Sequence, residues 1–162
     1  MSLDTVLVAV GTPANDQVDS LTATVRDVAG PAGAHVVLFH AFAQEGFAER
    51  VENLEYETAD EVSADEVATR LSNVENLQSA LSDADIGVSV AGAIGEPGEE
   101  TVTAAEKADA DLVFVGGRKR SPAGKAVFGS TAQEVMLNAP CPPATACGRR
   151  RTRGRRPPSR PP

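Results

Sequence analysis

Residues 111–138, DLVFVGGRKRSPAGKAVFGSTAQEVMLN, decide the fold of this chain. They begin with an apolar run typical of a buried strand, continue into a basic glycine-containing loop, and close in a segment with helical spacing. Gly129, Ser130 and Thr131 open that helix, so its free peptide N–H groups and the Ser130 hydroxyl are suited to an anion. The stretch therefore predicts a phosphate or similar anion as the ligand. A solvated basic loop capped by Ser130 is the alternative.

The loop gathers positive charge in a chain that is otherwise strongly acidic. Its four cations are Arg118, Lys119, Arg120 and Lys125. The loop is not a Walker loop, which needs Gly, four residues and then Gly-Lys-Ser/Thr. Here six residues separate Gly117 from Gly124, and alanine follows Lys125. A dinucleotide fingerprint is absent as well, because Gly11 stands alone after the first apolar run.

Further apolar runs predict the other strands of a sheet. These runs are continuous rather than alternating, which is the pattern of parallel strands covered by helices on both faces. The expected strands are residues 5–10, 35–42, 86–94 and 111–116, with a weak fifth strand near 143–147. Residues 142–148, PPATACG, are poor strand material because proline lacks the N–H that a ladder needs.

Helical spacing fills most of the segments between these strands. The expected helices are residues 16–29, 58–84, 99–110 and 129–138. Gly30 and Pro31 are expected to end the first helix, and the polar connection 43–57 is expected to be a loop or flap. The alternation predicts an α/β fold, an open parallel five-stranded sheet with helices on both faces. Ligands of such sheets bind at the carboxyl ends of the strands, here at the switch point between the first and fourth strands.

Composition limits the classes of protein that fit. A chain of 162 residues suits one domain, and aromatic content of 4% implies a core of Val, Ala and Leu. The N-terminus has no basic region before its apolar run, and no run approaches the roughly 20 residues of a membrane span. Cys141 and Cys147 lack metal-ligand spacing and are expected to be idle thiols in a reducing cytoplasm. We expect no metal site and no membrane partner.

Charge divides the chain into two parts. Residues 1–148 hold all 23 Asp and Glu and 8 of the 15 Lys and Arg, a net charge of −15, whereas residues 149–162 carry +7. So acidic a body repels nucleic acid and fits a cytoplasm that accumulates salt. We expect a domain over 1–148 and a disordered Arg/Pro-rich tail over 149–162. An idle tail is favoured over one that docks on an acidic surface.

Several segments together resemble the universal stress protein family. Its signature after the fourth strand is Gly, two residues, Gly, nine residues, Gly-Ser/Thr, which reads here as Gly116, Lys119 and Gly129-Ser130. The segment GEPGEETVTAAEKADADLVFVG is similar to the family's third helix and fourth strand. LVAVG near the start and APCP near the end are similar to further family landmarks, so the resemblance covers roughly residues 3–143.

The resemblance implies a Rossmann-type, adenine nucleotide alpha hydrolase-like fold, usually dimeric, in which many members bind ATP. By position, Gly116, Gly129, Ser130 and Thr131 would surround the ribose and phosphates, and Ala41 and Val115 would line the adenine pocket. Arg118 and Lys119 would add charge, although Lys119 replaces the second motif glycine and would either crowd the phosphate path or pair with a phosphate. Gly11 stands where ATP-binding members usually carry an acid. Because family dimers commonly pair their fifth strands, the weak fifth strand predicts a poorer homodimer.

The resemblance and the residues together predict a cytoplasmic stress-response protein that binds ATP, with Mg²⁺, or a related adenine nucleotide or anion, with little turnover. A nucleotide-independent interaction protein is the alternative, motivated by Gly11 and Lys119. A hydrolytic or nucleotidyl-transfer enzyme would need Lys119 or Lys125 and is less favoured. No pattern supplies a catalytic residue: His40, at the end of the second strand, is expected to be a hydrogen-bonded histidine.

Overall fold

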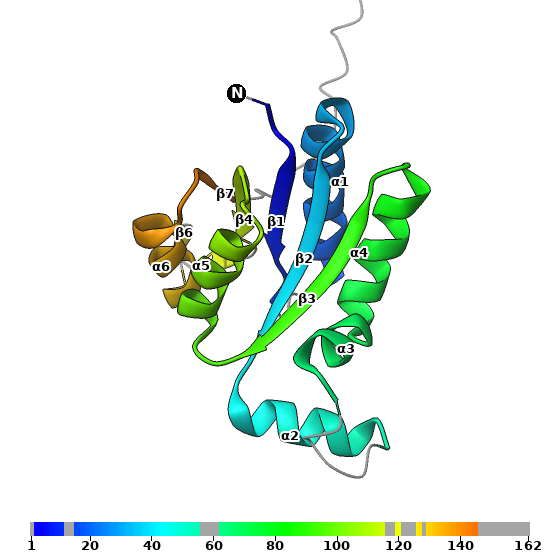
Figure 1. Cartoon of the computed structure of the whole chain (residues 1–162), viewed down its shortest axis with the longest axis vertical. Coiled ribbons are helices and arrows are strands. Elements are labelled where there is room, and N and C mark those ends of the chain that lie inside the picture. The colour runs from blue at the N-terminus through cyan, green and yellow to red at the C-terminus, as the bar shows by residue number, and fades with distance from the viewer. Residues whose placement is uncertain are drawn as a thin grey trace, which may run out of the picture.

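Five parallel strands form one open sheet in the order β3-β2-β1-β4-β7 (Figure 1). The computed structural model describes residues 2–11, 15–55, 62–115, 119–120, 126–127 and 129–145. The strands are β1 (Thr5–Ala9), β2 (His35–Phe42), β3 (Val88–Ile94), β4 (Leu112–Val115) and β7 (Pro143–Thr145). The predicted parallel five-stranded sheet is confirmed, and its last strand is short. Because β1 pairs with β2 on one side and β4 on the other, the switch point lies between β1 and β4 as predicted.

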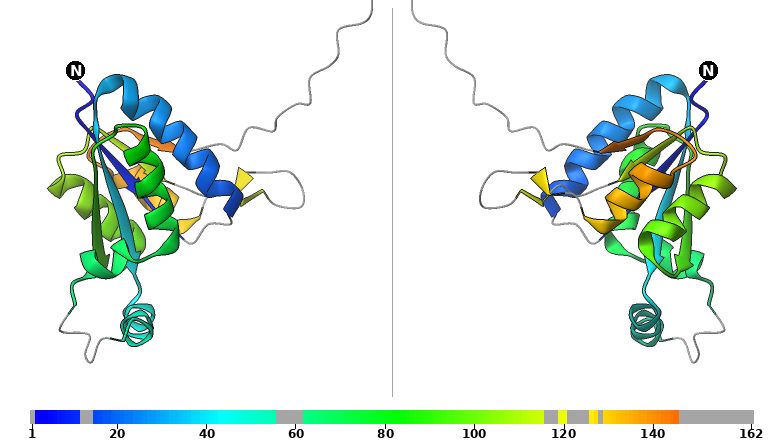
Figure 2. Two further views of the ribbon diagram at one scale, coloured as in Figure 1. Left: turned by 90° about the vertical axis from the view of Figure 1, so that its right-hand side faces the viewer. Right: turned by 90° about the vertical axis from the view of Figure 1, so that its left-hand side faces the viewer.

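Helices cover both faces of the sheet. They are α1 (Asn15–Ala32), α2 (Gln44–Asn53), α3 (Ala64–Thr69), α4 (Ser72–Asp83), α5 (Pro97–Lys107) and α6 (Ser130–Asn138). Figure 2 looks first at the side covered by α1 and α4, and then at the opposite side, covered by α5 and α6. None of the described helices is long and apolar enough to cross a membrane.

Two hydrophobic clusters form the core, one on each face, because alternate strand residues point to opposite sides. The larger cluster joins even-numbered strand residues such as Val6, Val8 and Leu38 to α1, α2, α3 and α4. The smaller cluster joins Leu7 and other odd-numbered strand residues to α5 and α6. Its buried members are Leu7, Phe39, Ala105, Ala110, Val113, Val115, Ala132 and Val135. The sheet therefore carries a thick layer on one face and a thin layer on the other.

The expected loop at 43–57 is wrong for most of its length, because α2 occupies Gln44–Asn53. Phe47 and Val51 lie one turn apart on this helix and are both buried. Phe47 packs edge-on against Phe42, with ring centroids 5.4 Å apart, so α2 is held to the end of β2. Figure 1 shows α2 beyond the carboxyl ends of the strands.

The single helix expected over 58–84 is also wrong, because two helices, α3 and α4, stand in its place. A capping box formed by Ser63 and Glu66 begins α3. The helix is interrupted at Arg70 and Leu71. Leu71 takes an extended conformation (φ −72°, ψ 129°), and its side chain is buried in the larger cluster. Residues 58–61 lie outside the described part of the chain.

The first helix does not end at Gly30 and Pro31, as expected, but continues to Ala32 with Pro31 inside it. Gly33 ends it instead, with φ +67°, a conformation that favours glycine. The peptide N–H of Ala34 donates to the carbonyl of Ala29 at 3.0 Å, which is the closing bond of a Schellman cap.

The remaining elements deviate from the expected bounds by a few residues. The strand expected over 86–94 is β3, Val88–Ile94, and the helix expected over 99–110 is α5, Pro97–Lys107. Within the basic loop, β5 (Lys119–Arg120) pairs antiparallel with β6 (Ala126–Val127). The tail expected over 149–162 lies outside the described residues. Pairing of fifth strands between two copies stays a prediction.

Candidate functional site

The carboxyl ends of β1 and β4 bring the predicted site residues into one region. Val115, the last residue of β4, is buried and pairs with Ala9 of β1. On the other side of Ala9 lies Phe39 of β2, and Ala41 follows two residues further along that strand. Ala41 packs against the same small cluster that contains Val115 and Ala132 of α6. The two residues expected to line an adenine pocket therefore share the face covered by α6.

The first turn of α6 lies at this end of the sheet. Gly129 is its N-cap, with ordinary extended dihedrals (φ −68°, ψ 166°), and no side-chain cap bond is made there by the described residues. This corrects the alternative expectation of a cap by Ser130. Gly129 and Ser130 are exposed and Thr131 is half-buried. The N–H groups at the start of a helix of this length favour negative charge there.

The described residues leave the space beside Gly129 open. A Cβ atom placed on Gly129 would meet no atom within 4 Å among the described residues. Neither its backbone conformation nor packing in this part of the structure requires glycine, so the absence of a side chain leaves room for a ligand to reach the backbone. The residues present therefore fit the phosphate of a nucleotide.

Gly98, a residue that the sequence did not single out, sets the position of α6. A Cβ atom on Gly98, in the first turn of α5, would lie 2.6 Å from Cβ of Glu134 and 3.7 Å from Cα of Thr131. The two helices can approach so closely only because this side chain is missing. The first turn of α6 is thereby fixed beside the first turn of α5.

Gly11, at the exit of β1, is exposed, and a Cβ atom there would likewise meet nothing within 4 Å in the described structure. Its carbonyl accepts a hydrogen bond of 2.6 Å from Nδ2 of Asn73 in α4. Sequence reasoning missed Asn73, because its partner lies 62 positions away and no local pattern marks it. The acid that ATP-binding relatives are expected to carry at this position would have room here.

His40 is hydrogen-bonded, as the sequence predicted. Its Nδ1 atom lies 2.6 Å from the carbonyl oxygen of Val10, and its ring lies edge-on to Phe42 with centroids 4.5 Å apart. Burial lowers the pKa of His40, the bond to Val10 opposes this effect, and the Arg50 cation of α2 lowers the pKa further. Burial and the Arg50 cation therefore favour the neutral ring of His40 beside the exit of β1.

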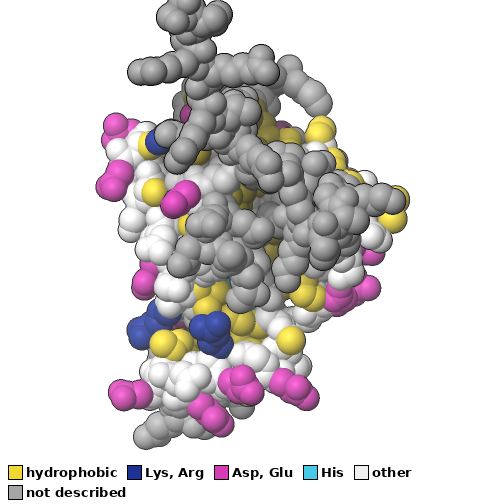
Figure 3. Space-filling model, turned by 180° about the vertical axis from the view of Figure 1, so that it is seen from behind, with side chains coloured by type: hydrophobic (Ala, Val, Ile, Leu, Met, Phe, Trp, Pro, Cys, Tyr) yellow, Lys and Arg dark blue, Asp and Glu magenta, His cyan; other side chains and the backbone are white. Residues whose placement is uncertain are grey.

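Only some residues of the predicted basic loop lie within the described part of the chain. Gly116 and Arg118 lie outside the described residues. Lys119 is the first residue of β5, paired with Val127 of β6. Its role toward a phosphate stays a prediction. Among the described side chains on the face shown in Figure 3, Asp and Glu spread along the edges and Lys and Arg are few.

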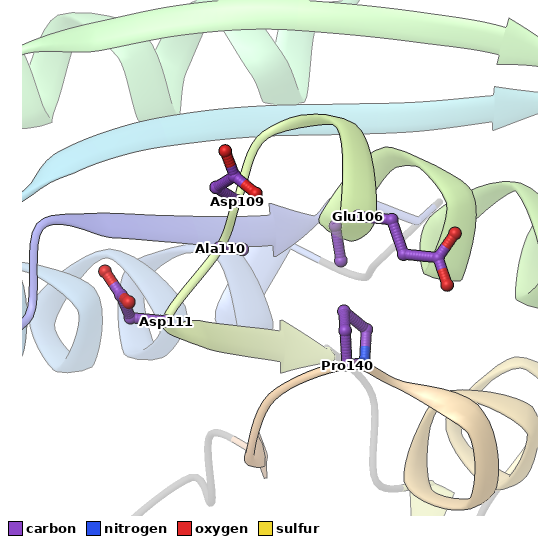
Figure 4. A pocket seen from close by; sticks show the side chains of 6 residues that line it. Glu106, Asp109, Ala110, Asp111 and Pro140 are labelled. Carbon is purple, nitrogen blue, oxygen red and sulfur yellow. The ribbon is translucent and has the colours of Figure 1, made fainter.

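A shallow pocket of about 420 Å³ lies at the opposite, amino end of the sheet. It is lined by Ala105, Glu106, Asp109, Ala110, Asp111 and Pro140. Figure 4 shows the three carboxylates pointing away from one another rather than converging. The carboxylate of Asp111 instead accepts the peptide N–H groups of Asp4 and Thr5, at 2.8 and 2.9 Å. Within the described ranges, no three His, Cys, Asp or Glu side chains gather to hold a metal ion.

The chain is similar to proteins of one family over most of its length. A model described as the universal stress protein family matches residues 2–144. A universal stress protein from Mycolicibacterium smegmatis is 33% identical over 86 residues, which are 52% of this chain and 66% of that relative.

Solved structures share the fold. A universal stress protein from Archaeoglobus fulgidus has a TM-score of 0.63 and 24% identity, covering 88% of this chain and 97% of that one. A structure of the universal stress protein from the same organism in complex with dAMP has a TM-score of 0.59 and 20% identity, covering 90% of this chain and 98% of that one.

Proposed function

The chain belongs to the universal stress protein family, and on that premise we propose that it binds an adenine nucleotide at the carboxyl ends of β1 and β4 with little or no turnover. The observation that carries the proposal is the start of α6, where Gly129 and Ser130 are exposed and the described residues neither cap the helix nor fill the space beside Gly129. Such a helix start attracts phosphate. The dAMP complex of the A. fulgidus protein supports an adenine nucleotide as the ligand.

The proposed site has an apolar part and an anion part. Ala41 and Val115 belong to the apolar cluster on the α6 face and would lie next to the base. The peptide groups of Gly129 and Ser130 would hold a phosphate, with Thr131 beside them. Gly116, Arg118 and Lys119 complete the proposed anion part, and Mg²⁺ would accompany ATP. Little or no turnover and a cytoplasmic location stay predictions.

Gly129→Asp separates ligand binding from folding. Aspartate is a preferred N-cap residue, so α6 should keep its stability or gain about a few tenths of a kcal/mol over glycine. The same carboxylate would occupy the free N–H groups and repel phosphate. We expect the affinity for AMP and for Mg²⁺-ATP, measured by isothermal titration calorimetry, to fall about tenfold or more, which corresponds to roughly 1.4 kcal/mol. Equal affinity in the variant and the wild type would refute the anion site.

Asn76→Asp is the matched control for added charge. Asn76 is exposed on α4, which covers the other face of the sheet from α6. It should leave nucleotide affinity unchanged while changing the net charge by the same amount. A loss of affinity equal to that of Gly129→Asp would show a general effect of charge rather than a local one.

A nucleotide-independent interaction protein is the second candidate, favoured by apolar side chains exposed on α6. Leu137 is 81% exposed and Met136 lies beside it, also exposed. Gly11→Asp distinguishes the two functions, because this position has room for the missing acid. If the wild type binds no adenine nucleotide but Gly11→Asp does, the rest of the nucleotide site is present and only the acid at position 11 is missing. The natural chain then has another role. The interaction protein would be favoured if neither the wild type nor Gly11→Asp bound adenine nucleotide in calorimetric titrations. It would also require a partner that is recovered in a pull-down with the wild type and lost with Leu137→Ser.

A further inference from the structure

Two side chains hold consecutive carbonyl groups where the chain leaves β1. Nδ1 of His40 lies 2.6 Å from the Val10 carbonyl oxygen, and Nδ2 of Asn73 lies 2.6 Å from that of Gly11. We propose that His40 and Asn73 are positioning residues of the nucleotide site, because together they fix the place and direction of Gly11. This inference rests on the proposed function, since Gly11 adjoins the proposed ligand.

His40 acts from the neighbouring strand β2. A carbonyl oxygen only accepts hydrogen bonds, so Nδ1 must carry the proton that the ring donates to Val10. The peptide N–H of Val10 donates to the carbonyl of Phe39 at 2.7 Å, so both polar backbone groups of Val10 are bound to β2. The ring packs edge-on against Phe42, which in turn contacts Phe47. The histidine therefore has little freedom to turn away from Val10.

Asn73 acts from α4, across the larger cluster. It lies in the first turn of that helix, and its Oδ1 accepts the peptide N–H of Val74 at 3.0 Å. The amide is thus oriented by its own helix, with Nδ2 directed to Gly11. Val74 next to it is fully buried, so the helix that carries the amide is anchored in the core. Gly11 is tied in this way to a rigid element.

Positioning of this kind matters because glycine is the residue with the most backbone freedom. Gly11 is exposed and has no neighbour within 4 Å of a Cβ position, so packing by the described residues does not hold it. The two hydrogen bonds replace that packing. Ligand binding then requires less ordering of the backbone, which improves affinity without any new contact to the ligand.

Asn73→Asp tests the half of the proposal that concerns Gly11. Aspartate has the same shape, keeps an oxygen for the Val74 N–H and suits the start of a helix, but it places an acceptor against the Gly11 carbonyl. We expect an unchanged midpoint of urea unfolding and an affinity for AMP about tenfold weaker. Asn76→Asp on the same helix, with an exposed side chain, should leave the affinity unchanged. Wild-type affinity in Asn73→Asp would overturn this half.

His40→Asn and His40→Gln form a matched pair for the other half. The amide nitrogen of asparagine takes the place of Nδ1, whereas that of glutamine takes the place of Nε2. We expect His40→Asn to keep AMP affinity within about twofold and His40→Gln to lose about tenfold, since only the first keeps the bond to Val10. Equal losses in both variants would show that the ring matters for packing alone.

A measurement on the free protein separates this inference from the proposed function. If the wild type binds neither AMP nor Mg²⁺-ATP, the proposed function fails, but the two hydrogen bonds remain testable. The ¹⁵N-heteronuclear NOE of Gly11 in the full chain should fall in Asn73→Asp and His40→Gln and stay at the wild-type value in Asn76→Asp. An unchanged NOE in the first two variants would overturn the positioning role whether or not a nucleotide binds.

Discussion

On one face of the sheet, α1, α3 and α4 bury leucine and valine side chains, whereas on the other, α5 and α6 bury alanine and valine. On the first face, α1 and α4 therefore pack through long side chains, whereas α3 approaches β3 closely at Gly92. The helices on the second face approach closely, as Gly98 shows by admitting Glu134. The apolar part of the proposed nucleotide site and the first turn of α6 lie on the thin side.

We infer from this difference that one face mainly stabilises the fold and the other carries the ligand site. Burial of apolar area is the main stabilising term in folding, so the face with the larger cluster should supply more of the stability. The thin face leaves the start of α6 exposed, which a ligand site needs. Asn73 and His40 reach the exit of β1 from the thick side, so this face also holds the backbone at Val10 and Gly11.

The largest expected effect comes from truncating a leucine on each face. Leu38 of β2 belongs to the larger cluster and Leu7 of β1 to the smaller, and both are 0% exposed. Leu38→Ala and Leu7→Ala should each lower the free energy of unfolding by about 2–5 kcal/mol. Leu38→Ala should lie nearer the upper value, because long side chains around it cannot collapse into the cavity. Urea unfolding monitored by circular dichroism measures both.

Nucleotide affinity gives the second half of this comparison. Leu7→Ala loosens the layer that carries α6, so it should weaken AMP binding more than Leu38→Ala at a temperature where both variants are folded. If Leu7→Ala proves the more destabilising, or leaves affinity untouched while Leu38→Ala abolishes it, the division between the faces is wrong.

A smaller effect should come from adding one methyl group at a close helix contact on each face. Gly92 of β3 approaches the carbonyl of Ala64 in α3 too closely to admit a Cβ atom, and Gly98 meets Glu134 of α6. Gly92→Ala and Gly98→Ala should each cost about 1–3 kcal/mol of stability through overpacking. Only Gly98→Ala should also weaken AMP binding, because only it displaces the start of α6.

Thermal unfolding and calorimetry on the same preparations test this pair. Glu134→Ala shortens the side chain but keeps its Cβ, so it should not rescue Gly98→Ala, whereas Glu134→Gly should. Equal effects of the two glycine variants on nucleotide affinity would mean that the position of α6 does not control the site.

The sheet and the start of α6 were predictable because their signals are local and strong. Continuous apolar runs marked β1, β2 and β4, and Gly129-Ser130 marked the beginning of the last helix, where the structure begins α6 at Ser130. The choice of Ala41 and Val115 came from the family resemblance, and the structure brings them onto one face. Their contact with a ligand stays a prediction.

What the sequence did not reveal depends on distant partners. The helical pattern of α2 rests on two buried residues, Phe47 and Val51, among glutamates, and only its docking on Phe42 shows why it forms. Leu71 fits the helical spacing of its neighbours, yet it is the N-cap of α4 with its side chain in the core. The bond from Asn73 to Gly11 joins positions 62 apart, which no local pattern encodes.

The smallest expected effect concerns β1, which is shared by both clusters and is held at its two ends by titratable groups. His40 binds its carboxyl end, and burial lowers the pKa of this histidine. Asp111 binds its amino end, and the peptide N–H groups of Thr5 and Asp4 lower the pKa of this carboxyl. In each case the unfolded chain takes up a proton at a higher pH than the folded chain, so stability falls as pH falls.

The two groups act in separate pH windows, which allows each end of β1 to be tested alone. The contribution of His40 should be complete above about pH 6.5 and decrease below it, and that of Asp111 should be complete above about pH 4 and decrease below it. In urea unfolding followed from pH 7 to 3, His40→Asn should flatten the upper window alone, because it keeps the bond to Val10 without a titrating ring. Asp111→Asn should flatten the lower window alone. Profiles parallel to the wild type in both windows would mean that neither end of the shared strand responds to pH, and that the link between the two faces rests on packing.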